Sequence, residues 1–316
     1  MKNNNQLWWP ICLSESVSTD KPIGLRLDDI ALAVYRDGNG YVRAVEDRCP
    51  HRRAPLSLGR ITPQGHIQCG YHGWTFNGET GDICGFPNLD PEERLPRCSI
   101  DTYTILENNG VIYLGLCEQP NELVTVTEQL TQQADGTSSS GRIMQGLSHQ
   151  EAVMAFLDNP NYFLNIIGVE FLDKILGNPK TVDGLLVCER AARWNLIGES
   201  RFYLGPLRHR ADFPLRLQTV TTPITGETLV KIYADENRLL TEILVTFTPA
   251  ARSMTAIHWK ATVFPQAWGR LKTLIQSITL LKQPAVSFKK HIDYTKLAEE
   301  LPTTGTAWHA LLSPSD

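Results

Sequence analysis

The sequence contains Cys49-Pro50-His51-Arg52-Arg53-Ala54-Pro55-Leu56 and, further along, Cys69-Gly70-Tyr71-His72-Gly73-Trp74-Thr75-Phe76. Each stretch pairs one cysteine with one histidine, separated by one or two residues. The two stretches together therefore offer two thiolates and two imidazoles, all of which bind transition metals. These four residues carry most of the information about the function of the chain.

A Rieske [2Fe–2S] cluster requires this set of ligands, with two cysteine sulfurs on one iron and two histidine nitrogens on the other. Neutral imidazoles in place of two thiolates remove negative charge from the cluster and make its reduction easier. We therefore expect Cys49, His51, Cys69 and His72 to bind such a cluster and the chain to handle single electrons.

Two other interpretations of the four residues stay open. Two Cys and two His can also hold a structural zinc ion, because tetrahedral S₂N₂ sites suit that metal. Zinc-finger spacings usually pair Cys with Cys and His with His, whereas here each stretch carries one of each. A chance occurrence of the pattern is the third possibility. The flanking residues favour the Rieske interpretation over both.

The two stretches resemble the Rieske domain of the Rieske non-haem iron oxygenases, a family that includes aromatic-ring-hydroxylating oxygenases and O-demethylases. They differ from the Rieske proteins of bc-type complexes, which carry two further cysteines that form a disulfide. Ala54 and Tyr71 stand at those two positions here. The resemblance covers about the first third of the chain.

The resemblance implies an α+β protein of two domains. Residues 1–118 are expected to form an all-β Rieske [2Fe–2S] domain, and residues 146–316 a helix-grip (START-like) domain with an antiparallel sheet and a long C-terminal helix. Residues 119–145 contain a polar run rich in Ser, Gln and Gly, which predicts a linker.

Local patterns predict the elements of both domains. Residues 30–35 and 41–45 read as strands joined by the turn Asp37-Gly38-Asn39-Gly40, and residues 111–116 read as a buried strand. A helical pattern covers residues 149–176, interrupted at Asn159-Pro160. Further strands are expected at 184–190, 194–200, 215–220, 228–234, 240–247 and 256–263, and helices at 266–281 and 285–300.

The family's catalytic domain binds a mononuclear iron through two His and one carboxylate, and here the sequence departs from that pattern. Asp158 aligns with the acid that bridges a cluster histidine of one subunit to the iron site of its neighbour. The two ligand histidines fall on Asn161 and Ile166, and Asp293 stands where a carboxylate ligand to iron is expected. Ligation by oxygen atoms, or by more distant histidines, would be the substitutes; the candidates are Asn161, Asn165, Glu170, Asp173, His149, His209 and His258.

Two functions follow from the resemblance. In the first, the chain is a terminal oxygenase component that accepts electrons from a separate reductase or ferredoxin and oxygenates a small organic substrate at a mononuclear Fe(II). In the second, it is an electron-transfer or structural subunit without its own catalytic iron, working with an iron-bearing oxygenase partner. Either way we expect a homo- or hetero-oligomer. The candidate pocket residues are Phe202, Tyr203, Phe247 and Trp259.

Composition and net charge indicate which partners and which cellular compartment to expect. A net charge of −4 over 316 residues gives no reason to expect nucleic acid or an anionic membrane as a partner. The most apolar later stretch, residues 271–281, is too short to span a bilayer. Seven cysteines, an odd number without framework spacing, favour a reducing compartment. We therefore expect a cytoplasmic protein.

Overall fold

The computed structural model describes residues 7–87, 94–117, 120–131, 136–166, 169–194, 214–234, 238–264, 286–289 and 292. The chain forms two compact units. The first consists of Met1–Val124 and Thr248–Thr255, and the second of Thr125–Phe247 and Ala256–Asp316. Among the described residues, no helix has the length and apolar character needed to cross a membrane.

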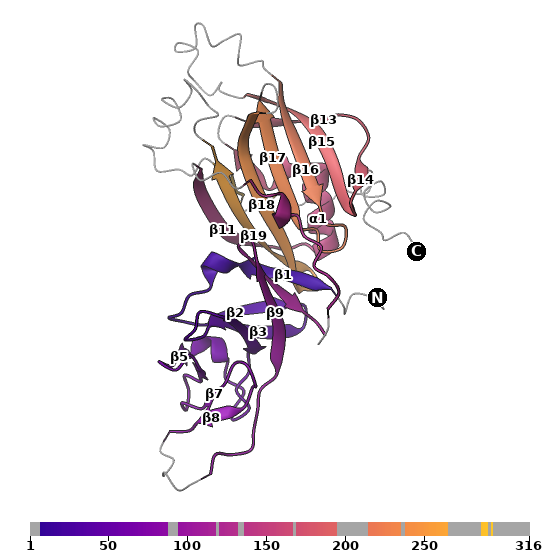
Figure 1. Ribbon diagram of the computed structural model, residues 1–316. Helices are drawn as coiled ribbons and strands as arrows, with labels where there is room; N and C mark the ends of the chain where they lie inside the picture. Colours follow the sequence, from indigo (N-terminus) through magenta and orange to yellow (C-terminus); the bar gives the residue numbers. More distant parts are fainter. Residues whose placement is uncertain are drawn as a thin grey trace. The chain divides into compact units, whose positions relative to one another are not determined.

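A six-stranded sheet with the order β1-β10-β9-β4-β3-β2 forms the frame of the first unit (Figure 1). Its neighbouring strands pair antiparallel. The strands are β1 (Trp8–Leu13), β2 (Ile23–Leu27), β3 (Ile30–Arg36), β4 (Val42–Glu46), β9 (Thr102–Asn108) and β10 (Val111–Gly115), with a short 3₁₀ turn at Ser14–Ser16.

The predicted β3–β4 hairpin is confirmed. The Asp37 carboxylate accepts hydrogen bonds from the backbone N–H groups of Asn39 and Tyr41, at 2.9 and 3.0 Å, which fixes the turn. Gly40 has a φ of +84°, a conformation that glycine adopts without steric cost. The buried strand predicted at residues 111–116 is also confirmed, as β10.

A second, smaller sheet of the first unit carries the cysteine stretches. It has four short strands in sequence order: β5 (Arg60–Ile61), β6 (Ile67–Gln68), β7 (Thr75–Phe76) and β8 (Ile83–Gly85). The first cysteine stretch lies between β4 and a 3₁₀ turn at Leu56–Leu58, and the second links β6 to β7. Both cysteines belong to a buried cluster with Leu56, Ile67 and Phe76. Core packing therefore fixes the base of each stretch.

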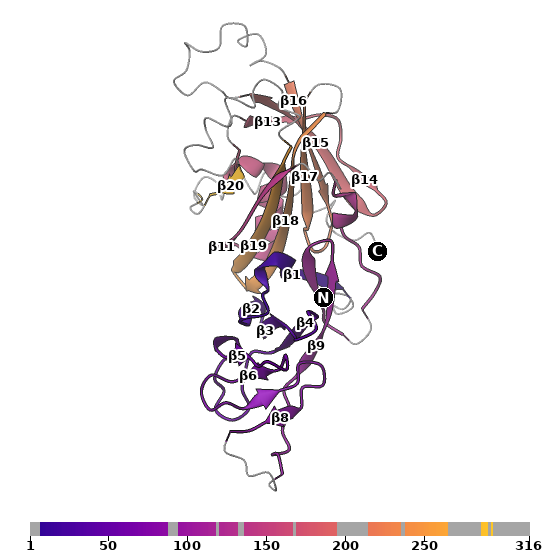
Figure 2. The same cartoon turned by 60° about the vertical axis from the view of Figure 1, so that its left-hand side comes forward.

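The second unit is built on a sheet of eight described strands. Seven of them run in the order β11-β19-β18-β17-β16-β15-β13, and β14 pairs with β15. Strands β11 and β19 lie side by side in both views (Figure 1, Figure 2). The bounds are β11 (Thr137–Gln145), β13 (Val169–Ile175), β14 (Lys180–Val182), β15 (Leu185–Trp194), β16 (Pro214–Thr221), β17 (Thr228–Ala234), β18 (Arg238–Ala251) and β19 (Met254–Val263).

One helix, α1 (His149–Asp158), packs on this sheet. Ser148 caps it, since the Ser148 hydroxyl and the Glu151 carboxylate satisfy each other's backbone N–H groups. Its buried residues, among them Val153 and Phe156, join the core formed by β15 to β19. The helix ends at Asn159-Pro160, followed by a 3₁₀ turn at Pro160–Tyr162; a further 3₁₀ turn spans Thr127–Gln129.

Two sequence predictions for the second unit need correction. The helical pattern at 149–176 is wrong beyond Asp158, because β12 (Leu164–Ile166) and β13 follow; short buried strands carry the same apolar density as a helix. The predicted helix at 285–300 is wrong at its start, where β20 (Val286–Phe288) pairs with β12. The rest of that helix, and the helix at 266–281, lie outside the described residues.

The polar linker predicted at 119–145 also differs from the structure. Its last nine residues form β11, which pairs with β19. Exposure alternates along β11, so that one row of side chains is more exposed than the other. A strand with one solvated face tolerates Ser and Thr there, and its backbone hydrogen bonds do not depend on side-chain polarity. The strand predicted at 194–200 begins inside β15, and its other residues lie outside the described part of the chain.

Candidate metal centre

The two cysteine stretches form loops with the same backbone hydrogen bonds. In the first loop, residues 49–54, the Cys49 N–H donates to Ala54 C=O at 2.9 Å and the Arg53 N–H donates to Cys49 C=O at 2.7 Å. In the second loop, residues 69–74, the Cys69 N–H donates to Trp74 C=O at 2.8 Å and the Gly73 N–H donates to Cys69 C=O at 3.0 Å. Each loop thus wraps around its cysteine in the same way.

The fifth residue of each loop has a left-handed backbone. Arg53 has a φ of +57° and Gly73 a φ of +72°. Glycine adopts this conformation without steric cost, whereas other residues lose roughly 1–2 kcal/mol. A Cβ on Gly73 would lie 2.5 Å from Pro87 Cγ, so the second loop also needs glycine for space. The two loops are therefore equivalent in backbone but not in side chain.

The two thiols lie at the base of the loops, with Cys49 2% and Cys69 3% exposed. Neither forms a disulfide. Burial, with a contribution from the neighbouring Cys69 side chain, raises the pKa of the Cys49 thiol to about 11. Paired buried thiols of this kind become thiolates when a metal displaces their protons.

The two imidazoles lie at the exposed end of the site. The ring centroids of His51 and His72 are 4.6 Å apart. Trp74 stacks on His51 with parallel planes and a centroid distance of 4.8 Å, and Phe86 packs on Trp74 at 5.3 Å. Partial loss of hydration, and after it the nearby His51 and Arg52, lower the pKa of His72. A neutral ring with a free nitrogen lone pair is the form that binds metal.

This arrangement fits a two-iron cluster better than a single zinc ion. In the described part of the chain, no three His, Cys, Asp or Glu side chains are placed to hold one metal ion together. A tetrahedral zinc site needs four ligands around one point, whereas each iron of a Rieske cluster takes only two protein ligands. The sulfurs at the buried end and the imidazoles at the exposed end match the latter.

In the second unit, the residues expected at the mononuclear iron site make other contacts. Asp158 is the half-buried last residue of α1. The Asn161 side-chain NH₂ donates to Phe171 C=O at 3.0 Å, while the Asn161 C=O accepts a hydrogen bond from Lys289 Nζ at 2.5 Å. Ile166 is 4% exposed and belongs to the apolar core. The two positions aligned with iron-binding histidines therefore serve backbone bonding and core packing.

Among the described residues, the substitute ligands do not come together around a common point either. Asn165 is exposed on β12, and Glu170 forms an ion pair with Arg193 at 2.8 Å. His149 Nε2 lies 2.9 Å from Thr225 O. His258 is buried on β19, its Nε2 has no hydrogen-bond partner in the described structure, and burial lowers its pKa to about 3. Asp173 lies in β13, whereas His209 and Asp293 lie outside the described residues.

Two of the predicted pocket residues are core residues. Phe247 is fully buried against Phe156, at 5.4 Å between ring centroids, and Trp259 stacks on Phe288 at 5.2 Å. Both side chains belong to the apolar core of the second unit. Phe202 and Tyr203 lie outside the described residues.

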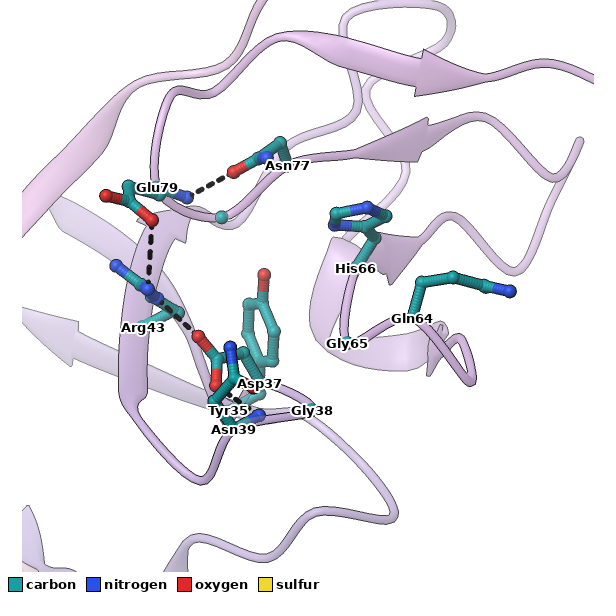
Figure 3. A pocket seen from close by; sticks show the side chains of 11 residues that line it. Tyr35, Asp37, Gly38, Asn39, Arg43, Gln64, Gly65, His66, Asn77 and Glu79 are labelled. Carbon is teal, nitrogen blue, oxygen red and sulfur yellow. Dashed lines mark hydrogen bonds and ion pairs between the residues drawn. The ribbon is translucent and has the colours of Figure 1, made fainter.

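A polar pocket of about 150 Å³ lies where the β3–β4, β5–β6 and β7–β8 turns meet (Figure 3). Tyr35 and His66 point into it, and Arg43 bridges Asp37 and Glu79 at 2.8 and 3.1 Å. The sequence did not predict this pocket, because three separate turns contribute to it. It contains none of the four Cys and His residues.

Comparison with known proteins identifies the first unit. The Rieske [2Fe–2S] domain family matches residues 7–104. Those residues form a Rieske domain. Protein TIC 55 of Arabidopsis thaliana is 39% identical over 110 residues, which cover 34% of this chain and 20% of that protein. Pheophorbide a oxygenase of Oryza sativa subsp. japonica is 34% identical over 128 residues, covering 38% and 24%. The matches thus span about a fifth to a quarter of these relatives.

The likeness in fold extends beyond the Rieske domain. The crystal structure of dicamba monooxygenase bound to dicamba superposes with a TM-score of 0.62 at 17% identity, covering 97% of this chain and 98% of that one. The chain therefore contains a Rieske [2Fe–2S] domain and shares the fold of dicamba monooxygenase over nearly its whole length.

The cysteine and histidine positions could be read from the sequence, but their surroundings could not. The stack of Trp74 on His51 joins two loops that are separated in sequence, and no local pattern predicts it. The left-handed backbone of Arg53 could not be predicted from the sequence either, because a residue type other than Gly, Asn or Asp gives no local signal for that conformation.

Proposed function

We propose that the protein is a Rieske-type oxidoreductase, the terminal oxygenase component of a system that receives its electrons from another protein. The observation that carries this proposal is the convergence of two buried thiols and two exposed imidazoles on matching loops of a Rieske domain. The likeness in fold to dicamba monooxygenase, over nearly the whole chain, supports the oxygenase part.

In this proposal Cys49 and Cys69 bind one iron, and His51 and His72 bind the other. Such a cluster supplies one-electron transfer. The buried thiols anchor it in the core, and the exposed imidazoles give electrons a route to and from the surface. Trp74 and the loop hydrogen bonds hold His51 and the two cysteines in place without a disulfide.

We propose that a separate reductase or ferredoxin supplies the electrons. The sequence has neither the Gly-x-Gly-x-x-Gly nucleotide fingerprint nor a plant-type Cys-x₄-Cys-x₂-Cys run. We further propose a small organic substrate, a homo- or hetero-oligomeric assembly and a cytoplasmic location. The seven free cysteines support a reducing compartment.

A second candidate function is an electron-transfer or structural subunit without its own catalytic iron. Asn161 and Ile166 favour it, because the first bonds to backbone and the second is core, so the aligned positions do not fit a mononuclear iron. We therefore derive no step at such an iron. Asp158 as bridging acid and Asp293 as ligand stay part of the first proposal.

Iron and acid-labile sulfide, measured per chain on anaerobically purified protein after Fe(II) reconstitution, separate the two candidates. Three irons with two sulfides, together with O₂ uptake coupled to substrate turnover, support the oxygenase. Two irons with two sulfides support the subunit. Protein that carries zinc and no sulfide contradicts both.

A further inference from the structure

Strand β15 of the second unit carries two arginines in opposite environments. Arg193 is exposed and forms an ion pair with Glu170 at 2.8 Å. Arg190 is only 4% exposed. Because side chains alternate along a strand, Arg190 lies on the same face of the sheet as Cys188 and Ala192, which belong to the apolar core. The buried arginine is therefore on the face that α1 covers.

The Arg190 guanidinium has no counter-charge in the described part of the chain. Its one hydrogen bond there runs from Nη2 to Leu157 C=O at 2.7 Å, near the end of α1. The Nε–H group has no partner. No carboxylate that the structure describes lies within ion-pair distance, and that includes Asp158, the residue after Leu157. A guanidinium does not lose its proton in proteins, so burial cannot remove the charge.

A capping role at the end of α1 accounts for only part of this arrangement. An arginine beside the last carbonyls of a helix interacts favourably with the helix dipole. That end of a helix carries about half an elementary charge, whereas a guanidinium carries a whole one. A buried charge without a full partner is strongly unfavourable. Arg216, which is more exposed, nevertheless has a full partner, Glu189 at 2.7 Å. Arg190 therefore keeps a positive charge that the cap does not neutralise.

The groups around Arg190 favour an anion over a metal ion. Lys289 Nζ donates to Asn161 C=O at 2.5 Å, and Arg190 donates to Leu157 C=O. Two cations thus contact the segment 157–161, whose Asn161 aligns with an iron-binding histidine. Like charges repel, so these cations oppose a divalent metal at this place. A carboxylate instead matches the planar guanidinium in charge and in geometry.

We propose that Arg190 binds the carboxylate of a small organic molecule with an apolar body. The carboxylate supplies the missing counter-charge and accepts a hydrogen bond from the Nε–H group. The apolar body matches the side chains beside Arg190 on this face, among them Ala192 and Leu217, which is opposite Arg190 on β16. This inference rests on the proposed function, because it names the class of the organic substrate. Binding needs no electron transfer, however, so the two can be tested separately.

The test is a calorimetric titration of the oxidised holoprotein without a reductant, so that no turnover occurs. The probes are phenylacetate and hexanoate, two carboxylates with apolar bodies. Phenylacetamide and hexanamide have nearly the same shapes without the charge, and sulfate represents a small inorganic anion. We expect the wild type to bind at least one carboxylate tenfold or more tightly than its amide, and tenfold or more tightly than sulfate.

Two variants of the buried arginine and one matched control identify the group responsible. Arg190→Met removes the charge and the N–H donors, whereas Arg190→Lys keeps a charge without the planar fork. We expect the carboxylate affinity to fall about tenfold or more in Arg190→Met and by a smaller factor in Arg190→Lys, with the amide affinity unchanged in both. Arg193→Met, at the exposed arginine of the same strand, should bind the carboxylate as the wild type does. Circular dichroism and thermal unfolding establish that each variant is folded.

Three results would overturn the inference. The first is a wild type that binds neither carboxylate more tightly than its amide. The second is a folded Arg190→Met with unchanged carboxylate affinity, or with equal losses for carboxylate and amide, which would limit Arg190 to supporting α1. The third is sulfate binding as tight as that of the carboxylates, which would indicate an inorganic anion site. If Arg190→Met does not fold, Arg190→Lys and the wild-type comparison decide. Carboxylate binding by a chain that forms no cluster would contradict the proposed function alone.

Discussion

The cysteine loops of the first unit and the segment after α1 in the second unit are the two candidate metal sites of this chain, and their side chains differ in kind. In the loops, Cys49 and Cys69 are buried side by side below two imidazoles. After α1, Asn161 bonds to the Phe171 backbone and Ile166 packs in the core. A scaffold can therefore be kept by packing alone, while chemistry depends on a few residue identities.

The largest effect is expected at the buried thiols. Cys69→Ser replaces a thiolate by a neutral hydroxyl and should abolish the cluster, as Cys49→Ser should. Visible absorbance, labile sulfide and the reduced EPR spectrum are the measurements. Cys84→Ser, at an exposed cysteine, is the control and should keep all three signals. A Rieske signal retained in Cys69→Ser would contradict the assignment of Cys69 as a cluster ligand, and with it the difference drawn between the two regions.

The second region is tested by placing histidines at the two positions that align with iron ligands. Asn161→His/Ile166→His should not gain a tightly bound iron, and should lose about 3 kcal/mol of stability, because a buried isoleucine is replaced by an imidazole without a partner. Asn165→His, at an exposed position on β12, is the matched control with an expected change below about 0.5 kcal/mol. An extra iron per chain at unchanged stability would mean that the metal pocket persists.

His258 is a histidine of the second unit, and its titration tests whether it serves core packing or metal binding. Its folded-state pKa of about 3 lies below the ordinary value of 6.5, because burial disfavours the charged ring. As pH falls, the unfolded chain therefore binds a proton at this histidine before the folded chain does. The contribution to the free energy of unfolding is fully present above pH 6.5 and is lost below it by roughly 1.4 kcal/mol per pH unit. Between pH 7 and 5 the wild type should lose about 2 kcal/mol more than His258→Gln in chemical denaturation. Equal losses would contradict this.

The two cysteine loops can be compared directly at their left-handed residues. Gly73→Ala introduces a Cβ at a φ of +72° and 2.5 Å from Pro87 Cγ, so we expect a loss of about 1–2 kcal/mol. Thermal unfolding of the holoprotein measures it. Gly110→Ala, also at a positive φ but in open space, separates backbone strain from the Pro87 clash. Equal losses in the two variants would mean that the clash with Pro87 contributes nothing.

The smallest change is expected for Arg53→Gly. Relief of the left-handed strain is offset by the greater freedom of glycine in the unfolded chain, so stability should stay within about 0.5 kcal/mol of the wild type. Unfolding of the holoprotein at low and high salt is the measurement. A large loss would mean that the Arg53 side chain supports the fold.

The sequence predicted what depends on short-range patterns. The Asp37–Gly40 turn and β10 follow from local turn chemistry and apolar runs, and the four Cys and His positions from two short motifs. It did not predict β12, whose buried apolar residues read equally well as helix, or β11, whose exposed Ser and Thr read as linker. Strand pairing joins residues far apart in sequence, and the residues of one strand do not indicate which strand it pairs with.

The same limit applies to the metal centre. The sequence supplied candidate ligands, but not the stacking of Trp74 on His51 or the strained Arg53, which arise when the two loops meet. In the second unit the sequence aligned Asn161 and Ile166 with iron-binding histidines, and the structure shows that Asn161 bonds to the Phe171 backbone and that Ile166 packs in the core.

Mixed cysteine and histidine ligation of one [2Fe–2S] cluster is the central claim, and the EPR spectrum of the reduced protein with nitrogen hyperfine analysis tests it most directly. We predict a Rieske signal with couplings from two inequivalent histidine nitrogens, one of which disappears in His51→Cys together with a fall in reduction potential. A reduced signal without nitrogen coupling, or zinc in place of iron, would contradict the account.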